Sequence, residues 1–205
     1  MLMLILFIIL SYIIGSIPTA VLICRLLHNV DIKKLGSGNP GTANVIRNLG
    51  LKTGLIVFFI DTLKGFLLPF LYLKLFKEPY SLEKAFIIGF FAVVGHIFSI
   101  FSNFKGGKGV ATSFGVGIAT LPFQALLSFL LFLLLLSFSK VVSISALISF
   151  LFFFIFTLII QSTIFLKIIV LSLFLLVIFK HKENIVRFLN GEENKLDLKK
   201  LLKNN

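Results

Sequence analysis

Charged residues are scarce in this chain of 205 residues: they make up 14% of it, whereas hydrophobic residues make up 58%. Soluble domains usually carry about 25% charged residues, because their surfaces face water. The scarcity excludes a globular cytosolic enzyme, a disordered protein and a fibrous protein. Tryptophan is absent, and Cys24 is the single cysteine, which excludes an internal disulfide and a cysteine-based metal site.

Long apolar runs dominate the sequence instead. They cover roughly residues 2–24, 53–73, 85–101, 109–138, 141–160 and 162–179. A helix crosses a bilayer with about 20 apolar residues, so we predict an all-α, polytopic integral membrane protein. The first run lacks the basic start of a signal peptide and is longer than the apolar part of one, which favours a retained membrane helix.

The number of passes depends on the run 109–138, which is long enough for one tilted helix or for two passes that turn near 121–123. Basic residues concentrate in cytoplasmic loops, and only two passes put the basic loops and the basic C-terminal tail on one side. We therefore predict seven transmembrane helices, with the N-terminus outside and the C-terminus cytoplasmic. A single domain is expected over 1–193, followed by a basic cytoplasmic tail over 194–205. The short fourth helix, 109–120, must be buried by its neighbours or by a cavity.

The formal net charge is +12. In a membrane protein this excess fits basic cytoplasmic loops beside anionic lipid, and phosphorylated substrates would also favour it. The lipid bilayer is therefore an expected partner and nucleic acid is not. The sequence indicates no obligate protein partner.

The first of three polar segments reads GSGNPGTANVIR over 36–47. Glycines let a backbone approach a ligand closely, and Ser37, Asn39 and Asn44 offer hydrogen bonds. Arg47 can bind a phosphate or a carboxylate through two parallel hydrogen bonds. We interpret the segment as a ligand-binding loop, with an ordinary connection between helices as the alternative. Its glycine spacing also fits a dinucleotide fingerprint, which we reject because no strand precedes it.

The second polar segment reads FKGGKGVAT over 104–112 and follows Gly95-His96. Glycines before a helix can direct N–H groups and the positive end of the helix at an anion. The segment is not a Walker loop, because glycine follows Lys108. A short turn with lysines reaching toward water is the alternative, and His96 alone would more often be structural. The candidate binding residues are Lys105, Gly106, Gly107, Lys108, Thr112 and His96.

The third polar segment reads HKENIVRFLNGEE over 181–193. His181, Asn184 and Arg187 are three residues apart, so they share one face of a helix that continues through them. A basic tail that anchors to lipid is the alternative. The predicted topology puts all three polar segments on the same side of the membrane, which suggests that they form one site.

Two ionisable residues lie inside the second apolar run. Asp61 and Lys64 share a helix face, and such groups are costly in a membrane and often functional. A paired structural role is equally plausible, and both roles stay open. The sequence contains no Ser–His–Asp order and no cluster of metal ligands, so no metal site is predicted.

The three segments, in this order, resemble the bacterial acyl-phosphate:glycerol-3-phosphate acyltransferase family (PlsY-type). SIPTA at 16–20 and DTLKG at 61–65 are also similar to that family, and the resemblance covers nearly the whole chain. Position 99 is a departure, because the family usually has proline where this chain has Ser99. Together with Ser102, this serine predicts a looser turn.

The resemblance implies a seven-helix enzyme of the bacterial plasma (inner) membrane with its site on the cytoplasmic side. It implies transfer of a fatty acyl group from acyl phosphate to the 1-hydroxyl of glycerol 3-phosphate. The products would be lysophosphatidic acid and phosphate, in the first acylation of phospholipid biosynthesis. The family uses neither acyl-CoA nor acyl carrier protein as direct donor and needs no metal or cofactor.

The resemblance also suggests roles for individual residues. The expected catalytic residues are Ser37, Arg47, Lys108, His181 and Asn184. Ser37 and Arg47 would bind glycerol 3-phosphate, Lys108 and the glycines of its loop would hold phosphate, and His181 and Asn184 would position the acceptor. The hydroxyl would attack the acyl carbonyl directly, with stabilisation of the developing charge supplying most of the acceleration. The base is either His181 or the acceptor's own phosphate.

Two other classes of protein remain as alternatives. A transporter of a phosphorylated or anionic solute would also carry basic polar segments, but alternating access places its site near the membrane midplane rather than at one face. A lipid-binding membrane protein without activity is the second alternative. Phosphate release that requires both substrates separates the enzyme from both.

Overall fold

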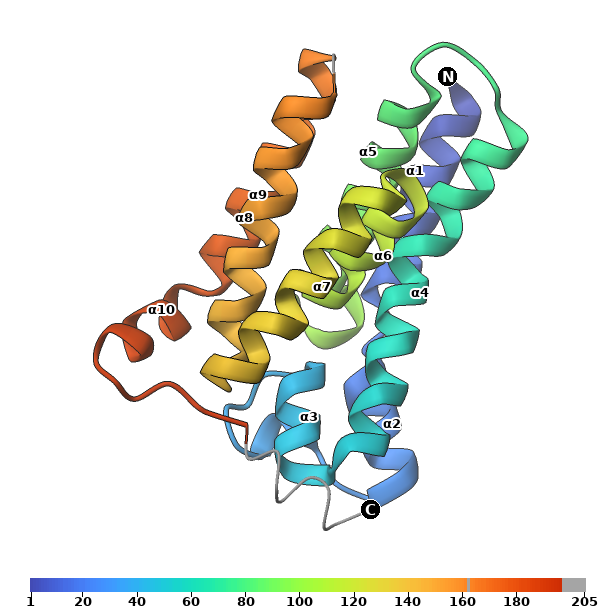
Figure 1. Cartoon of the computed structure of the whole chain (residues 1–205). Coiled ribbons are helices and arrows are strands. Elements are labelled where there is room, and N and C mark those ends of the chain that lie inside the picture. The colour runs from blue at the N-terminus through green and yellow to red at the C-terminus, as the bar shows by residue number, and fades with distance from the viewer. Residues whose placement is uncertain (162, 197–205) are drawn as a thin grey trace. The chain divides into compact units, whose positions relative to one another are not determined.

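The computed structural model describes residues 1–161 and 163–196. Within these residues the chain is helical and contains no strand (Figure 1). The helices belong to two compact units, Met1–Thr120 and Leu121–Leu196. Most of the predicted basic tail, 197–205, lies outside the described residues. The prediction of one domain over 1–193 therefore stays a prediction.

Unit 1 contains six α-helices and two short 3-10 helices. They are α1 (Leu2–Ser16), α2 (Thr19–His28), η1 (Ile32–Lys34), α3 (Thr42–Leu49), α4 (Leu51–Leu75), α5 (Ser81–Ile97), η2 (Ile100–Ser102) and α6 (Val110–Thr120). Unit 2 contains α7 (Pro122–Ser139), α8 (Val142–Ile160), α9 (Ile164–Lys180) and α10 (Lys182–Leu189).

Five helical segments are long and apolar enough to cross a membrane, or six if the bent α9–α10 pair counts as one span. The segments are Leu2–His28, Leu51–Leu75, Ser81–Ser102, Pro122–Ser139 and Val142–Ile160. The short apolar helix α6 comes in addition. The helical part of the prediction is therefore confirmed, whereas the number of seven passes and the placement of the termini stay predictions.

The first apolar run is not one helix, as the sequence suggested, but two helices separated at Ile17 and Pro18. Proline has no N–H and clashes with the preceding helical turn. The carbonyl of Ile17 therefore leaves the helical ladder, and the N–H of Thr19 donates to it at 2.9 Å. The break gives this end of α1 a backbone acceptor that other side chains can reach.

The long run 109–138 is interrupted where the charge distribution predicted it. Helix α6 ends at Thr120 and α7 begins at Pro122, in the first helical position. Proline is favoured there, because its missing N–H would have no partner inside the helix and its φ angle suits the helix. The predicted short fourth helix is thus confirmed as α6.

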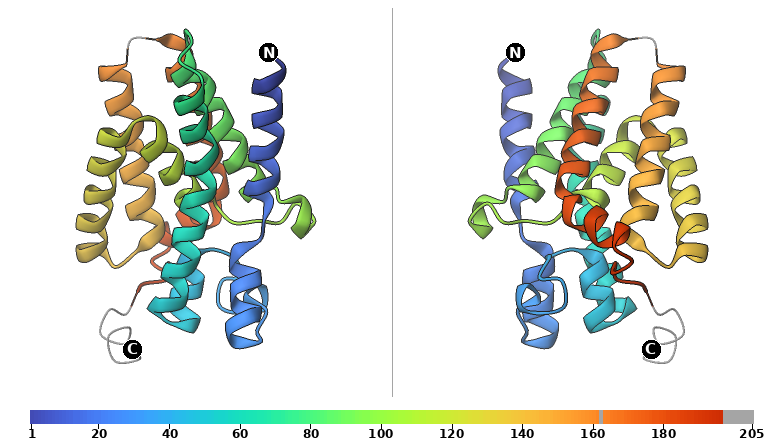
Figure 2. Two further views of the ribbon diagram at one scale, coloured as in Figure 1. Left: turned by 90° about the vertical axis from the view of Figure 1, so that its right-hand side faces the viewer. Right: turned by 90° about the vertical axis from the view of Figure 1, so that its left-hand side faces the viewer.

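Glycines let the helices of unit 1 approach at backbone distance. A Cβ atom on Gly15 of α1 would lie 2.1 Å from the carbonyl oxygen of Ala92 in α5. One on Gly65 of α4 would lie 1.9 Å from the carbonyl oxygen of Thr112 in α6. Small residues at helix crossings are typical of membrane proteins, where close packing replaces the hydrophobic effect. The two views of Figure 2 show α1 and α5 side by side.

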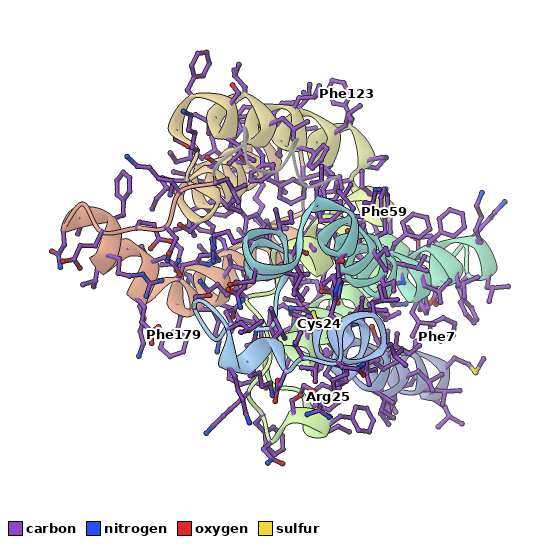
Figure 3. The ribbon with its side chains drawn as sticks, turned by 90° about the horizontal axis from the view of Figure 1, so that it is seen from below. Phe7, Cys24, Arg25, Phe59, Phe123 and Phe179 are labelled. Atoms are coloured by element: carbon purple, nitrogen blue, oxygen red, sulfur yellow. The ribbon has the colours of Figure 1, made fainter. Side chains whose placement is uncertain are left out.

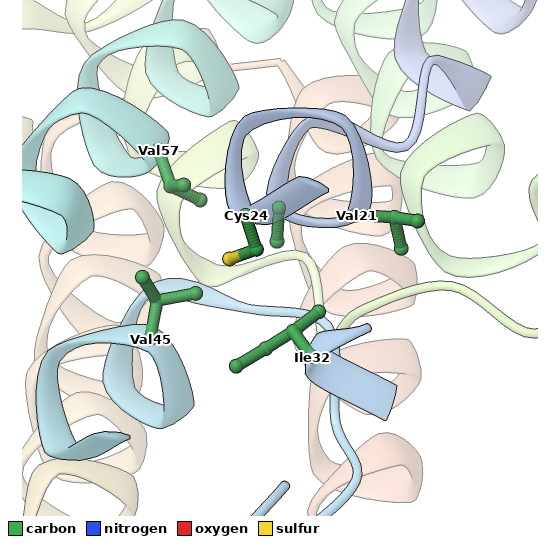
Figure 4. Packing of buried hydrophobic residues seen from close by; sticks show 6 residues of the cluster. Val21, Cys24, Ile32, Val45 and Val57 are labelled. Atoms are coloured by element: carbon green, nitrogen blue, oxygen red, sulfur yellow. The ribbon is translucent and has the colours of Figure 1, made fainter. Parts of the chain in front are cut away.

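A small apolar core holds the first polar segment against α4. Cys24 of α2, Ile32 of η1, Val45 of α3 and Val57 of α4 are fully buried and pack together (Figure 4). The chain between α2 and α3 is therefore fixed at both of its ends. This core positions the segment that carries Ser37 and Arg47.

Unit 2 is packed mainly by aromatic and aliphatic side chains. Phe174 of α9 stacks on Phe154 of α8, with ring centroids 5.6 Å apart. Other phenylalanines point outward, and Phe123 and Phe179 are exposed in the same way as Phe59 of unit 1 (Figure 3). Exposed apolar side chains on long apolar helices are the expected surface of a protein surrounded by lipid.

Candidate active site

Asn44 organises the loop that carries Ser37. Its side-chain Nδ2 donates to the carbonyls of Leu35 (2.9 Å) and Ile32 (3.3 Å), and its Oδ1 accepts from the N–H of Ser37 (3.1 Å). The residue is 1% exposed. Its amide group is thus occupied inside the protein, and it shapes the loop instead of offering the ligand contact suggested by the sequence. Nδ2 of Asn48 donates to the same Oδ1 at 3.0 Å.

Ser37 is exposed at the tip of this loop, and Arg47 is half-buried in the last turn of α3. Gly36 and Gly38 flank the serine with φ angles of 55° and 70°, which side chains disfavour. Asn39 is half-buried. A Cβ atom on Gly41 would lie 2.8 Å from its side-chain Nδ2. The loop therefore presents Ser37 outward and needs its glycines to do so.

The second segment is a glycine loop, residues 104–109, that runs into the N-terminus of α6. Its backbone is tied to the end of α5, because the N–H of Gly106 donates to Ile97 (3.0 Å) and that of Gly107 to His96 (3.1 Å). A Cβ on Gly107 would lie 2.3 Å from Nε2 of His96. A larger residue at this position would have to displace the ring. The glycines predicted for anion binding thus also have a packing reason.

The loop ends at Gly109, whose φ of 83° turns the chain into α6. The first N–H groups of a helix have no partner inside it and can bind an anion. Lys108 is half-buried just before this helix, and Lys105 is exposed on the loop. Thr112, a predicted ligand contact, is fully buried in the first turn of α6 against Gly65.

One pocket joins the first two polar segments. Its empty space, part of it open to solvent, is about 230 Å³. Pro40 contributes from the first segment, and His96, Gly106 and Gly107 contribute from the second. The remaining lining residues are Ser16, Ile17, Pro18, Thr19, Ser99 and Ser102. The convergence predicted from topology is thus observed for these two segments.

The wall made by the α1–α2 break was missed by the sequence analysis as part of the site. The hydroxyl groups of Ser16 and Thr19 are buried there and make no hydrogen bond within the described residues. Two polar residues beside a proline in an apolar run are the pattern that could have indicated them. Ser99 was expected to loosen its turn, but its hydroxyl donates to the carbonyl of Ser16 and anchors the turn to α1.

The third polar segment, in unit 2, is not the continuous helix that the spacing suggested. The chain bends by 57° between α9 and α10, and His181 lies at the bend. The ring Nδ1 of His181 is 2.8 Å from the carbonyl of Val177. Since a carbonyl only accepts, Nδ1 carries the proton, and Nε2 of a neutral ring is left as the acceptor. His181 is 2% exposed.

Glu193 returns after α10 to organise Asn184 and Arg187. Its Oε1 accepts from Nδ2 of Asn184 (2.6 Å) and from Oγ of Ser143 (2.9 Å), and its Oε2 accepts from Nε of Arg187 (2.9 Å). Burial acts to raise the pKa of Glu193, but these hydrogen bonds outweigh it and lower the pKa from its usual value. Gly191, with φ of 74°, makes the turn that brings the carboxylate back.

The role of Glu193 was missed by the sequence analysis, although the residue ends the quoted motif. The signal was a glycine turn followed by an acidic residue in a basic segment. In the described residues, no group of three or more His, Cys, Asp and Glu side chains has the geometry of a metal site.

Known proteins match this chain along nearly its whole length. The family model described as glycerol-3-phosphate acyltransferase matches residues 5–191. Glycerol-3-phosphate acyltransferase 2 of Bacillus anthracis is 43% identical over 194 residues, covering 94% of this chain and 98% of that protein. Glycerol-3-phosphate acyltransferase of Staphylococcus carnosus (strain TM300) is 39% identical over 199 residues, covering 95% and 98%.

Solved structures agree with these relatives. PlsY (YgiH), an integral membrane glycerol 3-phosphate acyltransferase, matches in its glycerol 3-phosphate form with a TM-score of 0.90 and 34% identity, over 97% of this chain and 98% of that one. Its lysophosphatidic acid form matches with a TM-score of 0.86 and 33% identity, over the same shares of the two chains, 97% and 98%. The predicted resemblance is confirmed: the chain is a helical integral membrane protein and belongs to the glycerol-3-phosphate acyltransferase family.

Proposed function

We propose that the protein transfers a fatty acyl group from acyl phosphate to the 1-hydroxyl of glycerol 3-phosphate. The ester bond of lysophosphatidic acid forms, the acyl–oxygen bond of the donor breaks, and phosphate leaves while the acceptor hydroxyl loses its proton. The observation that carries the proposal is the pocket of unit 1, where a glycine loop at a helix N-terminus meets the loop of Ser37, in a chain that matches the family over 5–191.

We assign glycerol 3-phosphate to Ser37 and Arg47, and phosphate to Lys108 with the N–H groups beside Gly106 and Gly107. Arg47 can bind a phosphate through two parallel hydrogen bonds, and the exposed Ser37 is available as a further donor. Lys108 and the start of α6 would stabilise the negative charge that develops on the donor. Asn39, Lys105 and His96 would contribute secondary contacts around them.

We infer a direct attack by the acceptor hydroxyl, because acyl phosphate is already activated. Its proton goes either to Nε2 of His181 or to the phosphate of the acceptor. The contact of Nδ1 with Val177 supports the tautomer of a neutral ring in which Nε2 is the nitrogen that accepts, and the hydrogen bond to Glu193 fixes the amide of Asn184. A His181→Ala variant that keeps most of its turnover would exclude His181 as an essential base.

The proposed setting is the bacterial plasma membrane, with seven passes and the site on the cytoplasmic side. The helical segments and the additional short helix α6 support this count, and the basic residues support the side. Cysteine-accessibility labelling of single-cysteine variants at Lys52 and Lys77 tests it. We expect labelling of position 52 from the cytoplasm and of position 77 from outside, and the reverse pattern would contradict the topology.

The reaction is tested with purified protein in detergent or lipid. Palmitoyl phosphate is supplied with and without glycerol 3-phosphate, omitting metal and CoA, and phosphate and lysophosphatidic acid are measured. We expect phosphate release only with both substrates. Folded protein that releases no phosphate in response to the acceptor would contradict acyl phosphate as donor, and acyl-CoA would then be tested, followed by solute transport.

A further inference from the structure

Asp61 and Lys64 form a buried ion pair in α4 that the proposed reaction does not use. Nζ of Lys64 donates to Oδ1 of Asp61 at 2.7 Å, and the two side chains are 4% and 2% exposed. Removing two charges from water is costly, and apolar side chains of similar size often stabilise a protein equally well. Stability alone is therefore a weak reason for the pair.

The pair reaches one wall of the pocket through Lys64. Its Nζ also donates to the carbonyl of Ile17, the acceptor that the Pro18 break leaves outside the helical ladder. Ile17 and Pro18 both line the pocket. Lys64 thus fixes the α1–α2 break against α4.

The pair reaches the opposite wall through Asp61. Its Oδ1 lies 3.6 Å from Nδ1 of His96, whose other ring nitrogen faces Gly107. The carbonyl of His96 accepts from the N–H of Gly107. Gly65, the residue after Lys64, packs on Thr112 in the first turn of α6, so this part of α4 also contacts the helix that the glycine loop enters.

We propose that Asp61 and Lys64 are positioning residues of the acyl transfer, an inference that rests on the proposed function. They hold His96 and the α1–α2 break at a fixed separation, so that the glycine loop and Lys108 are preorganised for phosphate. Preorganised donors cost no rearrangement when charge develops. The pair acts through His96 and Gly107 and does not itself touch the reacting atoms.

The decisive comparison is between single and double neutral variants. Asp61→Asn and Lys64→Met each leave an unpaired buried group, so each should lower both the melting temperature and the activity. The double variant removes both charges, and its melting temperature should recover to within a few degrees of wild type. Its KM for at least one of the two phosphate-bearing substrates should stay raised about tenfold or more, with a smaller change in kcat. Full recovery of KM together with stability would show a purely structural pair and overturn the proposal.

Hydrogen exchange of the glycine loop gives a readout that does not depend on turnover. The N–H groups of Gly106 and Gly107 are hydrogen-bonded to Ile97 and His96, so they should exchange faster in the double variant, while amides in α8 stay unchanged. Unchanged exchange in the loop would overturn the proposal. If the double variant does not fold, Asp61→Glu keeps the charge and shifts it by one methylene. It should raise the same KM about threefold, and an unchanged KM would overturn the proposal.

The matched control is a partly exposed ion pair away from the pocket, in which Glu78 of the α4–α5 connection lies 3.1 Å from Lys84 of α5. The Glu78→Gln/Lys84→Met variant should keep wild-type KM values and wild-type exchange in the glycine loop. If the wild-type protein shows no turnover that depends on the acceptor, the proposed function is contradicted. Hydrogen exchange of the glycine loop then tests the positioning role of Asp61 and Lys64 without any activity measurement.

Discussion

The two units of the chain use polar side chains in opposite ways. In unit 1 they join different helices: Oγ of Ser11 in α1 donates to the carbonyl of Ile88 in α5 at 2.7 Å, and Lys64 of α4 donates to Ile17. In unit 2 most hydroxyl groups bond within their own helix, as Ser149 does to Ser145 and Thr157 does to Phe153. Unit 1 is therefore cross-linked by hydrogen bonds, whereas unit 2 is packed mainly by apolar contacts.

The distribution of glycine differs between the two units in the same way. Unit 1 has glycines at its helix crossings, whereas residues 121–190 contain none. Close backbone approach and cross-linking restrain the pocket of unit 1, as the phosphate binding that we propose for its glycine loop would require. Polar cross-links in unit 2 concentrate at α10, around Glu193. The comparison indicates that polar groups link helices mainly where a site needs fixed geometry.

The largest expected effect comes from filling a glycine crossing in unit 1. A Gly65→Val variant would press side-chain carbons against the backbone of Thr112, where even a Cβ would lie at 1.9 Å. Backbone cannot yield as a side chain can, so we expect a loss of about 3 kcal/mol or more, or no folded protein. Thermal unfolding in detergent measures it. Ala146→Val in unit 2 is the control, and an equal loss there would contradict the comparison.

Removal of one positive charge that we assign to phosphate binding should have the next largest effect. Lys108→Met and Arg47→Gln should each lower kcat/KM about 100-fold, as loss of one stabilising donor commonly does. The melting temperature should change little. Lys52→Met, on an exposed position of α4, is the control for net charge and should keep full activity. Activity near the wild-type value in both site variants would remove these residues from the proposed site.

Loss of the Glu193 carboxylate should destabilise unit 2 in a pH-dependent way. Glu193→Gln weakens three hydrogen bonds to a charged group, for about 2 kcal/mol. Because the folded pKa is lowered, this contribution is present above the unfolded value of about 4.3 and is lost as pH falls through the folded pKa. Melting temperatures of wild type and variant should therefore converge in acid. The control is Glu192→Gln at the exposed residue before Glu193. Its melting temperature should differ little from that of wild type at any pH.

The smallest expected effect comes from removing single hydroxyl groups, and it tests the difference between the two units directly. Ser11→Ala removes a buried hydrogen bond between helices and should cost about 1 kcal/mol. Ser149→Ala removes one within a helix, which contributes little or slightly destabilises, and should be nearly neutral. Both serines are buried, so the two variants differ mainly in the bond removed. Equal melting temperatures would mean that cross-links do not distinguish the units.

Much of the fold was predictable because its determinants are local. Apolar length identified the helices, and Pro122 at the start of α7 confirmed the break inside the run 109–138. Pro18 is an equally local signal, yet it was missed, because a membrane helix can also accommodate proline as a kink. Whether proline breaks or bends a helix depends on whether other groups hydrogen-bond the backbone that it frees. Here Nζ of Lys64 and the N–H of Thr19 both donate to the carbonyl of Ile17 and stabilise the break.

The site residues divide in the same way. Residue type identified Ser37, Arg47 and Lys108 as candidates, because their chemistry suits phosphate. The sequence could not tell whether the amide of Asn44 serves a ligand or its own loop, since its partners, such as Leu35, are backbone carbonyls placed by the tertiary fold. The role of Glu193 depends on the turn at Gly191, which brings the chain back to α10. The spacing of apolar residues in the sequence does not predict such a turn.

Helix α6 has only eleven residues, which span about 16 Å, whereas the hydrocarbon core of a bilayer is about 30 Å thick. Such a segment is too short to enter the membrane by its own hydrophobicity during synthesis. The crossings at Gly65 and Gly115 give it a partner in α4, which precedes it along the chain. We therefore expect an order of membrane insertion, in which α4 enters first and α6 then assembles against it.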